Sequence, residues 1–400
     1  MKLSRLILPL SILFALLWVI HRYVWIRLVR DAVWPAAWGH ALTIAVVVLA
    51  LLIPAVFLTM RSLSRTWALP LSWLAYTWMG LLFYLLLFTS LADMGKGLAA
   101  LAGRLPQDPQ DKIRLARQLS VSIAAAAGIF GLGGFLNVLR GFKVRRVRVP
   151  LAHWPDQAAD FRIVQLSDVH VGPTIGRNMI ENLVRKVNEL DPELIVITGD
   201  LVDGTVEQLR EHVDPLRKLS ARHGVFFVTG NHEYYSGADE WIGHLAALGV
   251  RVLRNECVAI DGRFELAGVD DYTAAAVLPD HGQDIAKATA GRDPSRALVL
   301  LAHQPKAVSE ALAHGVDLQI SGHVHGGQIF PFNWLARLDQ PLITGLHRVD
   351  SMWVYVSEGT GYWGPPMRVG TRCEISVIEL VGGEAGGSKF KNRPSKRKPA

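Results

Sequence analysis

Cysteine is nearly absent from this 400-residue chain, which has only Cys257 and Cys373, far apart in the sequence. They do not form a Cys-x-x-Cys pair. The sequence therefore excludes a thiolate zinc site and a framework of several disulfides. A single bridge between the two thiols, and with it the redox compartment, stays open.

Acidic residues are scarce at the start of the chain. Residues 1–150 contain 17 basic and 4 acidic residues, a net charge of +13, whereas residues 151–380 contain 19 basic and 30 acidic residues, a net charge of −11. The overall charge of +7 therefore comes from the N-terminal part and from the tail 381–400, which we predict to be basic and disordered. Basic residues beside apolar segments suit anionic headgroups. The acidic middle shows no basic face, so no nucleic-acid partner is implied.

Charge is missing altogether from four apolar stretches. They are Leu6–Ile20, Ala41–Met60, Leu69–Ala92 and Leu119–Leu139. About twenty apolar residues cross a bilayer, so the last three qualify and the first is marginal. The first stretch has no small-residue cleavage site before Arg22, so we favour an uncleaved span over a signal peptide. We predict a membrane domain over residues 1–145 with about four transmembrane helices, three being the alternative.

The predicted spans carry no Asp, Glu or Lys, which disfavours an ion or proton path and favours a role as an anchor. Lys and Arg residues divide almost evenly between the two sides of a four-span topology. The dense cluster Arg140–Arg148 after the last span favours a cytoplasmic catalytic domain in a multi-pass protein of the cell membrane.

Strand-like and helix-like segments alternate after residue 150. Expected strands are Phe161–Ser167, Leu194–Thr198, Val225–Thr229, Leu298–Leu301 and Leu318–Ser321, and expected helices are Asn178–Leu190 and Val206–Arg222. This is α/β alternation early and more β structure later, so we predict an α/β fold. Active-site residues of open α/β sheets lie at the carboxyl ends of strands.

Polar clusters follow most of these strands. They are Asp168-Val169-His170, Gly199-Asp200-Leu201-Val202-Asp203, Gly230-Asn231-His232-Glu233, the single His303, and Gly322-His323-Val324-His325. A carboxylate or imidazole at the end of a buried strand is costly to desolvate without a partner, and metal ions are the natural shared partner. Two alternatives stay open: Asp203 as a helix N-cap, and His303 as a hydrogen-bonded bystander.

The ordered set DxH, GDxxD, GNHE, H and GHxH resembles the calcineurin-like metallophosphoesterase superfamily. The segment Gly359–Arg368 is similar to a signature of its membrane-associated bacterial phosphodiesterase branch. The resemblance implies a β-sandwich flanked by helices over residues 150–380. It also implies that Asp168, His170 and His325 bind one metal, that Asn231, His303 and His323 bind a second, that Asp200 bridges both, and that His232 is a general acid oriented by Asp203.

By the same resemblance the protein is expected to be a membrane-anchored, metal-dependent phosphoric ester hydrolase of the phosphodiesterase type. Two divalent ions, Mn, Fe or Zn, would supply a bridging hydroxide that attacks phosphorus in a phosphodiester or phosphomonoester. The alternative substrate is a lipid-linked pyrophosphate such as a nucleotide-activated lipid. Gly359–Arg368, with Tyr362 and Trp363, is expected to form one wall of the pocket, and Arg368 to hold a second phosphate. The alternative is plain packing of aromatic side chains on a Pro-rich loop. A non-catalytic scaffold that retains the fold is the remaining alternative.

Overall fold

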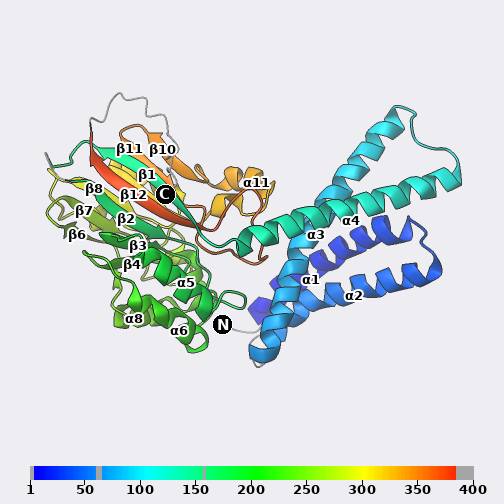
Figure 1. The fold of residues 1–400 in the computed structure, drawn as a ribbon, viewed down its shortest axis with the longest axis horizontal. Helices are drawn as coiled ribbons and strands as arrows, with labels where there is room; N and C mark the ends of the chain where they lie inside the picture. The colour runs from blue at the N-terminus through cyan, green and yellow to red at the C-terminus, as the bar shows by residue number, and fades with distance from the viewer. Residues whose placement is uncertain (1–3, 60–64, 156–158, 384–400) are drawn as a thin grey trace, which may run out of the picture.

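The computed structural model describes residues 4–59, 65–155 and 159–383. A splayed bundle of long helices is joined to a domain of two sheets (Figure 1). The helices are α1 (Ser4–Trp25, continued by a π-helical segment Ile26–Arg30), α2 (Ala36–Thr59), α3 (Arg65–Leu101) and α4 (Pro109–Leu139). Each contains a segment long and apolar enough to span a membrane, which favours four spans over three. The first of these segments is Ser11–Arg30, which extends beyond the marginal stretch Leu6–Ile20.

The helices are longer than the charge-free stretches from which they were expected. Helix α3 runs nine residues beyond Ala92, to Leu101, and α4 begins ten residues before Leu119, at Pro109. The start of α4 is fixed locally, because the Asp108 carboxylate accepts hydrogen bonds from the N–H groups of Gln110 and Asp111. Large apolar side chains such as Ile44, Leu51 and Ile129 are exposed on the bundle, as expected of surfaces that face acyl chains.

The first sheet has six strands in the order β1-β12-β2-β3-β4-β5. They are β1 (Lys143–Leu151), β12 (Glu374–Gly382), β2 (Phe161–Leu166), β3 (Leu194–Thr198), β4 (Val225–Val228) and β5 (Arg251–Val252). Strands β2 to β5 are parallel, and β12 pairs antiparallel to β2. Helices α5 (Arg177–Asn188), α6 (Val206–Val213) and α8 (Ala238–Ala247) bury apolar side chains such as Leu183, Leu209 and Trp241 in one cluster with the outer face of this sheet.

The second sheet also has six strands, in the order β10-β11-β9-β8-β7-β6. They are β10 (Gly345–Val349), β11 (Met352–Val356), β9 (Leu318–Ser321), β8 (Ala297–Leu301), β7 (Phe264–Gly268) and β6 (Glu256–Ile260). Helices α9 (Ile285–Thr289) and α10 (Val308–Ala313) cover its outer face. The inner faces of the two sheets share a core that includes Phe161, Val196 and Phe264. The predicted α/β class, with a β-sandwich flanked by helices, is therefore confirmed.

The basic cluster Arg140–Arg148 is more than a patch of charge beside the membrane. From Lys143 onward it is edge strand β1, paired in parallel with β12. Arg145 lies 3.5 Å from Glu374, Arg146 lies 3.5 Å from Glu379, and Arg148 lies 3.1 Å from Asp160. Several of its basic side chains are thus paired with carboxylates of the acidic domain, and the first sheet begins before the expected boundary at residue 150.

Two further expectations differ in extent. The helical pattern over Val206–Arg222 forms an α-helix only to Val213, followed by a 3-10 turn over Asp214–Lys218, because Pro215 cannot continue the hydrogen-bonded ladder. Strand β12 continues to Gly382, inside the predicted tail, and the rest of that tail from residue 384 lies outside the described residues. Both cysteines are free, so no bridge joins them.

The bundle and the sheet domain touch through the segment that follows β11. The buried Met367 side chain packs on glycines of α3 and α4, and a Cβ added at Gly80 would lie 2.6 Å from its sulfur. Tyr84 of α3 donates a hydrogen bond to the Phe330 carbonyl at 3.0 Å, and the Asn137 amide of α4 donates to the Arg368 carbonyl at 2.8 Å. The glycines of α3 and α4 therefore allow the sheet domain to pack closely against the bundle.

Candidate metal centre

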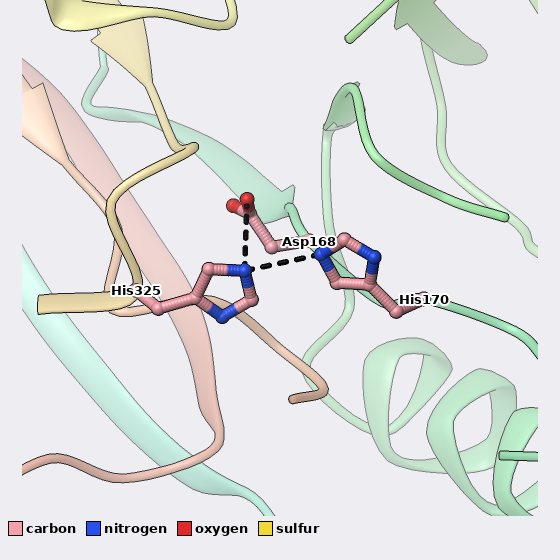
Figure 2. A group of neighbouring side chains, drawn as sticks. All are labelled: Asp168, His170 and His325. Atoms are coloured by element: carbon pink, nitrogen blue, oxygen red, sulfur yellow. Dashed lines mark hydrogen bonds and ion pairs between the residues drawn. The ribbon is translucent and has the colours of Figure 1, made fainter. Parts of the chain in front are cut away.

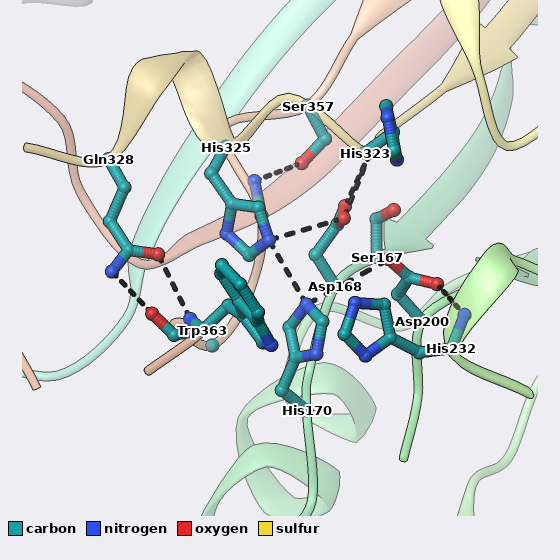
Figure 3. A network of polar contacts seen from close by, with 12 residues as sticks. Ser167, Asp168, His170, Asp200, His232, His323, His325, Gln328, Ser357 and Trp363 are labelled. Carbon is teal, nitrogen blue, oxygen red and sulfur yellow. Dashed lines mark hydrogen bonds and ion pairs between the residues drawn. The ribbon is translucent and has the colours of Figure 1, made fainter. Parts of the chain in front are cut away.

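The predicted site residues gather where the carboxyl ends of strands from both sheets meet (Figure 3). Asp168 and His170 follow β2, and Asp200 follows β3. Asn231 opens α7 (Asn231–Ser236) just after β4, while His303 follows β8 and the pair His323 and His325 follows β9. Because β2, β3 and β4 are neighbours in one sheet and β8 and β9 in the other, residues distant in sequence become adjacent.

Left-handed backbone conformations are concentrated at this site. The φ angles of Asp168, His170, Asp200, His323 and His325 lie between +51° and +72°. Asp168 and His170 therefore do not lie on extended backbone, and both side chains still reach one group. Such conformations are uncommon outside glycine, and Asp and His adopt them more readily than most residues. Each costs about 1–3 kcal/mol and is typical of functional sites.

Asp168, His170 and His325 form the first group (Figure 2). His325 Nε2 lies 3.1 Å from His170 Nε2 and 3.5 Å from Asp168 Oδ1. His170 Nδ1 lies 2.9 Å from the Asp203 carboxylate. Donation of the Nδ1 proton to that carboxylate leaves Nε2 of His170 free to ligate a cation, the arrangement common for metal-binding histidines.

Asp200, His303 and His323 form the second group. His303 Nε2 lies 3.1 Å from Asp200 Oδ2 and 3.2 Å from His323 Nδ1. His303 Nδ1 donates to the Thr198 carbonyl at 2.7 Å, so its Nε2 faces Asp200. Burial opposes the charged ring, but Asp200 outweighs it and raises the pKa of His303 well above its usual range, so a cation bound here would replace the Nε2 proton. Asp200 Oδ2 is 4.0 Å from His170 Nε2, which places this carboxylate between the two groups.

Asn231 provides the test of whether a cation fits. Its side-chain Oδ1 is buried and has no hydrogen-bond partner among the described residues. Such an oxygen costs about 1–3 kcal/mol when it is left unsatisfied. A divalent cation held beside it would supply the missing partner. The complete set of carboxylate, imidazole and amide donors, without thiolate, suits Mn, Fe or Zn.

Burial also favours the ligating form of two imidazoles. Burial, and next the charge of Arg368, hold the pKa of His325 well below its usual range. Burial and the neighbouring His303 lower the pKa of His323 to about 4. Both rings are therefore neutral near neutral pH, as metal binding requires.

His232 stands beside the two groups and is held at both its main chain and its ring. Its backbone N–H donates to Asp200 Oδ1 at 2.9 Å, and its Nδ1 lies 2.6 Å from Asp203 Oδ1. Burial opposes the charged imidazole, but the bond to Asp203 and the charge of Asp200 outweigh it and raise the pKa of His232 to about 9. Burial likewise opposes the Asp203 carboxylate, yet His170 and His232 lower its pKa to about 2.

Known proteins resemble this chain in sequence. The sequence profile of the calcineurin-like phosphoesterases matches residues 161–327. A "Transmembrane protein with metallophosphoesterase domain" from Danio rerio is 36% identical over 90% of this chain and 85% of its own length. The protein of the same name from Bos taurus is 40% identical over 81% of this chain and 77% of its own. The chain belongs to the calcineurin-like phosphoesterase family.

Solved structures resemble this chain only weakly. The 5'-nucleotidase precursor from Thermus thermophilus matches with a TM-score of 0.34 and 16% identity, over 56% of this chain and 55% of that one. A similarity at that level carries no argument about the substrate. Assignment to the family rests on the sequence relatives, and these also carry the word transmembrane in their names.

Glu233 supports the candidate site, a role that the sequence analysis did not single out. It is fully buried, and its carboxylate accepts hydrogen bonds from the N–H groups of Asp200, Leu201 and Gly230 at 2.9, 2.8 and 2.7 Å. It therefore fixes the turn that presents Asp200. An acidic residue three positions after Gly230, at the start of a helix, is the capping signal that predicts this contact.

Arg368 does not serve as a second phosphate ligand. Its side chain is 1% exposed, and its guanidinium donates to the carbonyls of Glu358, Gly361 and His325. A further contact joins it to His325 Nδ1 at 3.1 Å. Arg368 instead ties the segment after β11 to the loop that carries His325.

We expect Arg368→Lys to destabilise the protein. One ammonium cannot reproduce a fork that serves several carbonyls at once, so buried acceptors lose partners at a cost of about 2 kcal/mol. The midpoint of thermal unfolding should fall by about 4–8 °C, or somewhat less for a larger cooperative unit. The control is Arg217→Lys, an exposed position, which should leave the midpoint unchanged. Equal midpoints for the two variants contradict the bracing role of Arg368.

Proposed function

We propose that this protein is a membrane-anchored phosphoesterase that hydrolyses phosphate esters with two divalent ions held at the site described above. The position of Asp200 carries the proposal, because this one buried carboxylate contacts residues of both ligand groups. Asp168, His170 and His325 would hold one ion. Asn231, His303 and His323 would hold the other, and Asp200 would contact both.

Two divalent ions, when bound, supply positive charge to the phosphoryl oxygens and acidify water. The rest of the chemistry belongs to the chain. His232 is positioned to give its proton to the departing oxygen, and Asp203 holds the ring by Nδ1 so that Nε2 is the donating atom. Asp203 also orients His170, so a single carboxylate aligns both the proton donor and a ligand.

The rim of the site favours an amphiphilic substrate, and we propose a lipid-linked phosphodiester or pyrophosphate. Trp363 is 55% exposed, with its ring centroid 5.7 Å from that of His232. Tyr235, 66% exposed, also contacts this imidazole, with its ring centroid 5.4 Å away. Two exposed aromatic side chains thus lie beside the predicted proton donor.

Hydrolysis by the full-length protein in lipid nanodiscs tests this function. The protein is stripped with a chelator, reloaded separately with Mn²⁺, Zn²⁺ or Fe²⁺, and given a soluble nitrophenyl diester, a lipid-linked diester and a lipid-linked pyrophosphate. We expect activity that disappears on stripping and returns on reloading, with a higher kcat/KM for a lipid-linked substrate than for the soluble one. Activity that survives stripping contradicts the metal-dependent reaction, and equal kcat/KM values contradict the lipid-linked substrate.

We also propose that the sheet domain faces the cytoplasm. Although Arg145, Arg146 and Arg148 are paired within the domain, Arg140 and Lys143 still follow α4 directly. A single reactive cysteine placed at the exposed Ser220, in a chain without Cys257 and Cys373, should react with a membrane-impermeant maleimide only after cells are permeabilised. Labelling of the cysteine at position 220 in intact cells would contradict a cytoplasmic sheet domain and indicate the opposite topology.

A further inference from the structure

A cavity outside the metal centre lies between α4, the last membrane helix, and the segment that joins the sheet domain to it. Its volume is about 500 Å³, within the range of small-molecule sites. Helix α4 forms one wall, and residues 368–372 form the other. The Asn137 side chain connects the two walls by donating hydrogen bonds to the carbonyls of Arg368 and Thr371 at 2.8 and 2.7 Å. The cavity is therefore built into the junction.

The two ends of this junction cavity differ in chemistry. Along α4, Ile129 and Phe130 lie at one end of the lining, and Arg140 and Lys143 lie at the other. Arg372 belongs to the basic end, because the Lys143 N–H donates to the carbonyl of the next residue, Cys373, at 2.8 Å. Ile129 and Arg140 are eleven residues apart on α4 and its cap, which at 1.5 Å per residue separates the ends by about 16 Å. An occupant must therefore present negative charge at one end and hydrocarbon at the other.

The side chains at the basic end have no acidic partners among the described residues. Among the described residues, none of Arg140, Lys143 and Arg372 forms an ion pair. The one carboxylate that lines the cavity, Glu358, is already compensated, because it accepts from the Arg372 N–H at 3.0 Å and lies 3.6 Å from Arg145. Three basic side chains without acidic partners form a favourable binding site for a phosphate group.

The position along α4 identifies the source of that phosphate. The apolar side chains Ile129, Leu132, Leu136 and Leu139 are exposed, so α4 carries hydrocarbon surface up to its last residue. The basic side chains follow immediately, at the depth where the helix leaves the apolar layer and headgroups lie. A soluble phosphate compound would make no use of the apolar end.

We propose that this junction cavity binds an anionic phospholipid, with its phosphate at Arg140, Lys143 and Arg372 and an acyl chain along Ile129 and Phe130. The site is separate from the metal centre. It uses none of the predicted metal ligands, and Arg368, which lines both regions, turns its donors toward His325 and the neighbouring carbonyls. The proposal thus stands whether or not the protein hydrolyses phosphate esters.

The test is a titration of the detergent-solubilised full-length protein with acyl-labelled phosphatidylglycerol in mixed micelles, followed by fluorescence anisotropy. Phosphatidylcholine with the same labelled chain is the reference lipid. The variant R140Q/K143Q removes two of the three cations. We expect the apparent Kd for phosphatidylglycerol to rise about 30-fold, which corresponds to about 2 kcal/mol for two basic side chains. Binding of phosphatidylcholine should not change.

The matched control is R146Q/R148Q, which removes the same charge from the neighbouring strand β1 at exposed positions outside the cavity. It should bind phosphatidylglycerol like the unaltered protein. An equal loss in both variants indicates diffuse attraction to a basic surface and overturns the site. Full displacement of the labelled lipid by glycerol 3-phosphate at equal concentration overturns the role of the apolar end.

Discussion

Asp200→Ala should abolish hydrolysis and empty both metal positions. Asp200 Oδ2 lies 3.1 Å from His303 Nε2 and 4.0 Å from His170 Nε2, so its loss removes the carboxylate that serves both ligand groups. The loss in metal affinity should exceed the about 10–100-fold that follows removal of an outer partner of a ligand. Elemental analysis after gel filtration measures the metal content, and a nitrophenyl diester measures the activity.

Asp203→Asn provides the graded comparison. Asp203 contacts His170 Nδ1 rather than an ion, so this variant should retain the metal of the second group and bind the first about 10–100-fold more weakly. Asp280→Asn, an exposed substitution, controls for the change in charge. Two equivalents of metal retained by Asp200→Ala, with a normal unfolding transition, would contradict a shared carboxylate.

The ligand positions were accessible to sequence reasoning because they obey a simple geometric rule. Each follows a short run of apolar residues, such as Leu194–Thr198, whose five residues are all buried in the structure. The carboxyl ends of parallel strands meet at one edge, so polar residues placed there converge. The pattern therefore favoured a shared site for residues such as Asp168 and Asp200, whereas the place of His303 among the ligands was implied by the resemblance to the family.

Other features depend on contacts that local pattern does not encode. The residues of β1 read as a basic cluster, and only their pairing with β12, at the far end of the chain, makes them a strand. Arg368 was expected to bind phosphate because the local sequence does not reveal that it is buried. Its burial arises only when residues 358–371 fold around it. The left-handed backbone at Asp168 and His323 is likewise imposed by the surroundings, since neither residue type requires it.

Loss of the proposed proton donor should affect substrates according to their leaving groups. We expect His232→Ala to lower kcat for an alkyl phosphodiester by about 10²–10⁴-fold, the usual contribution of a general acid. Hydrolysis of a nitrophenyl ester should fall much less, because nitrophenolate leaves without protonation. Metal content should remain unchanged, since the His232 ring is held by the Asp203 carboxylate through Nδ1. The third cluster of possible ligands, His170, Asp203 and His232, is already joined by contacts of 2.9 and 2.6 Å to Asp203.

Two measurements separate this role from a structural one. The ratio of alkyl to nitrophenyl hydrolysis is insensitive to a uniform loss of folded protein, so a change in the ratio reports on proton transfer. His153→Ala, at an exposed position remote from the site residues in sequence and on the short turn after β1, should leave the ratio unchanged. If both esters slow by the same factor in His232→Ala, the ring positions the substrate or Asp200 instead, and the proton must reach the leaving oxygen from solvent.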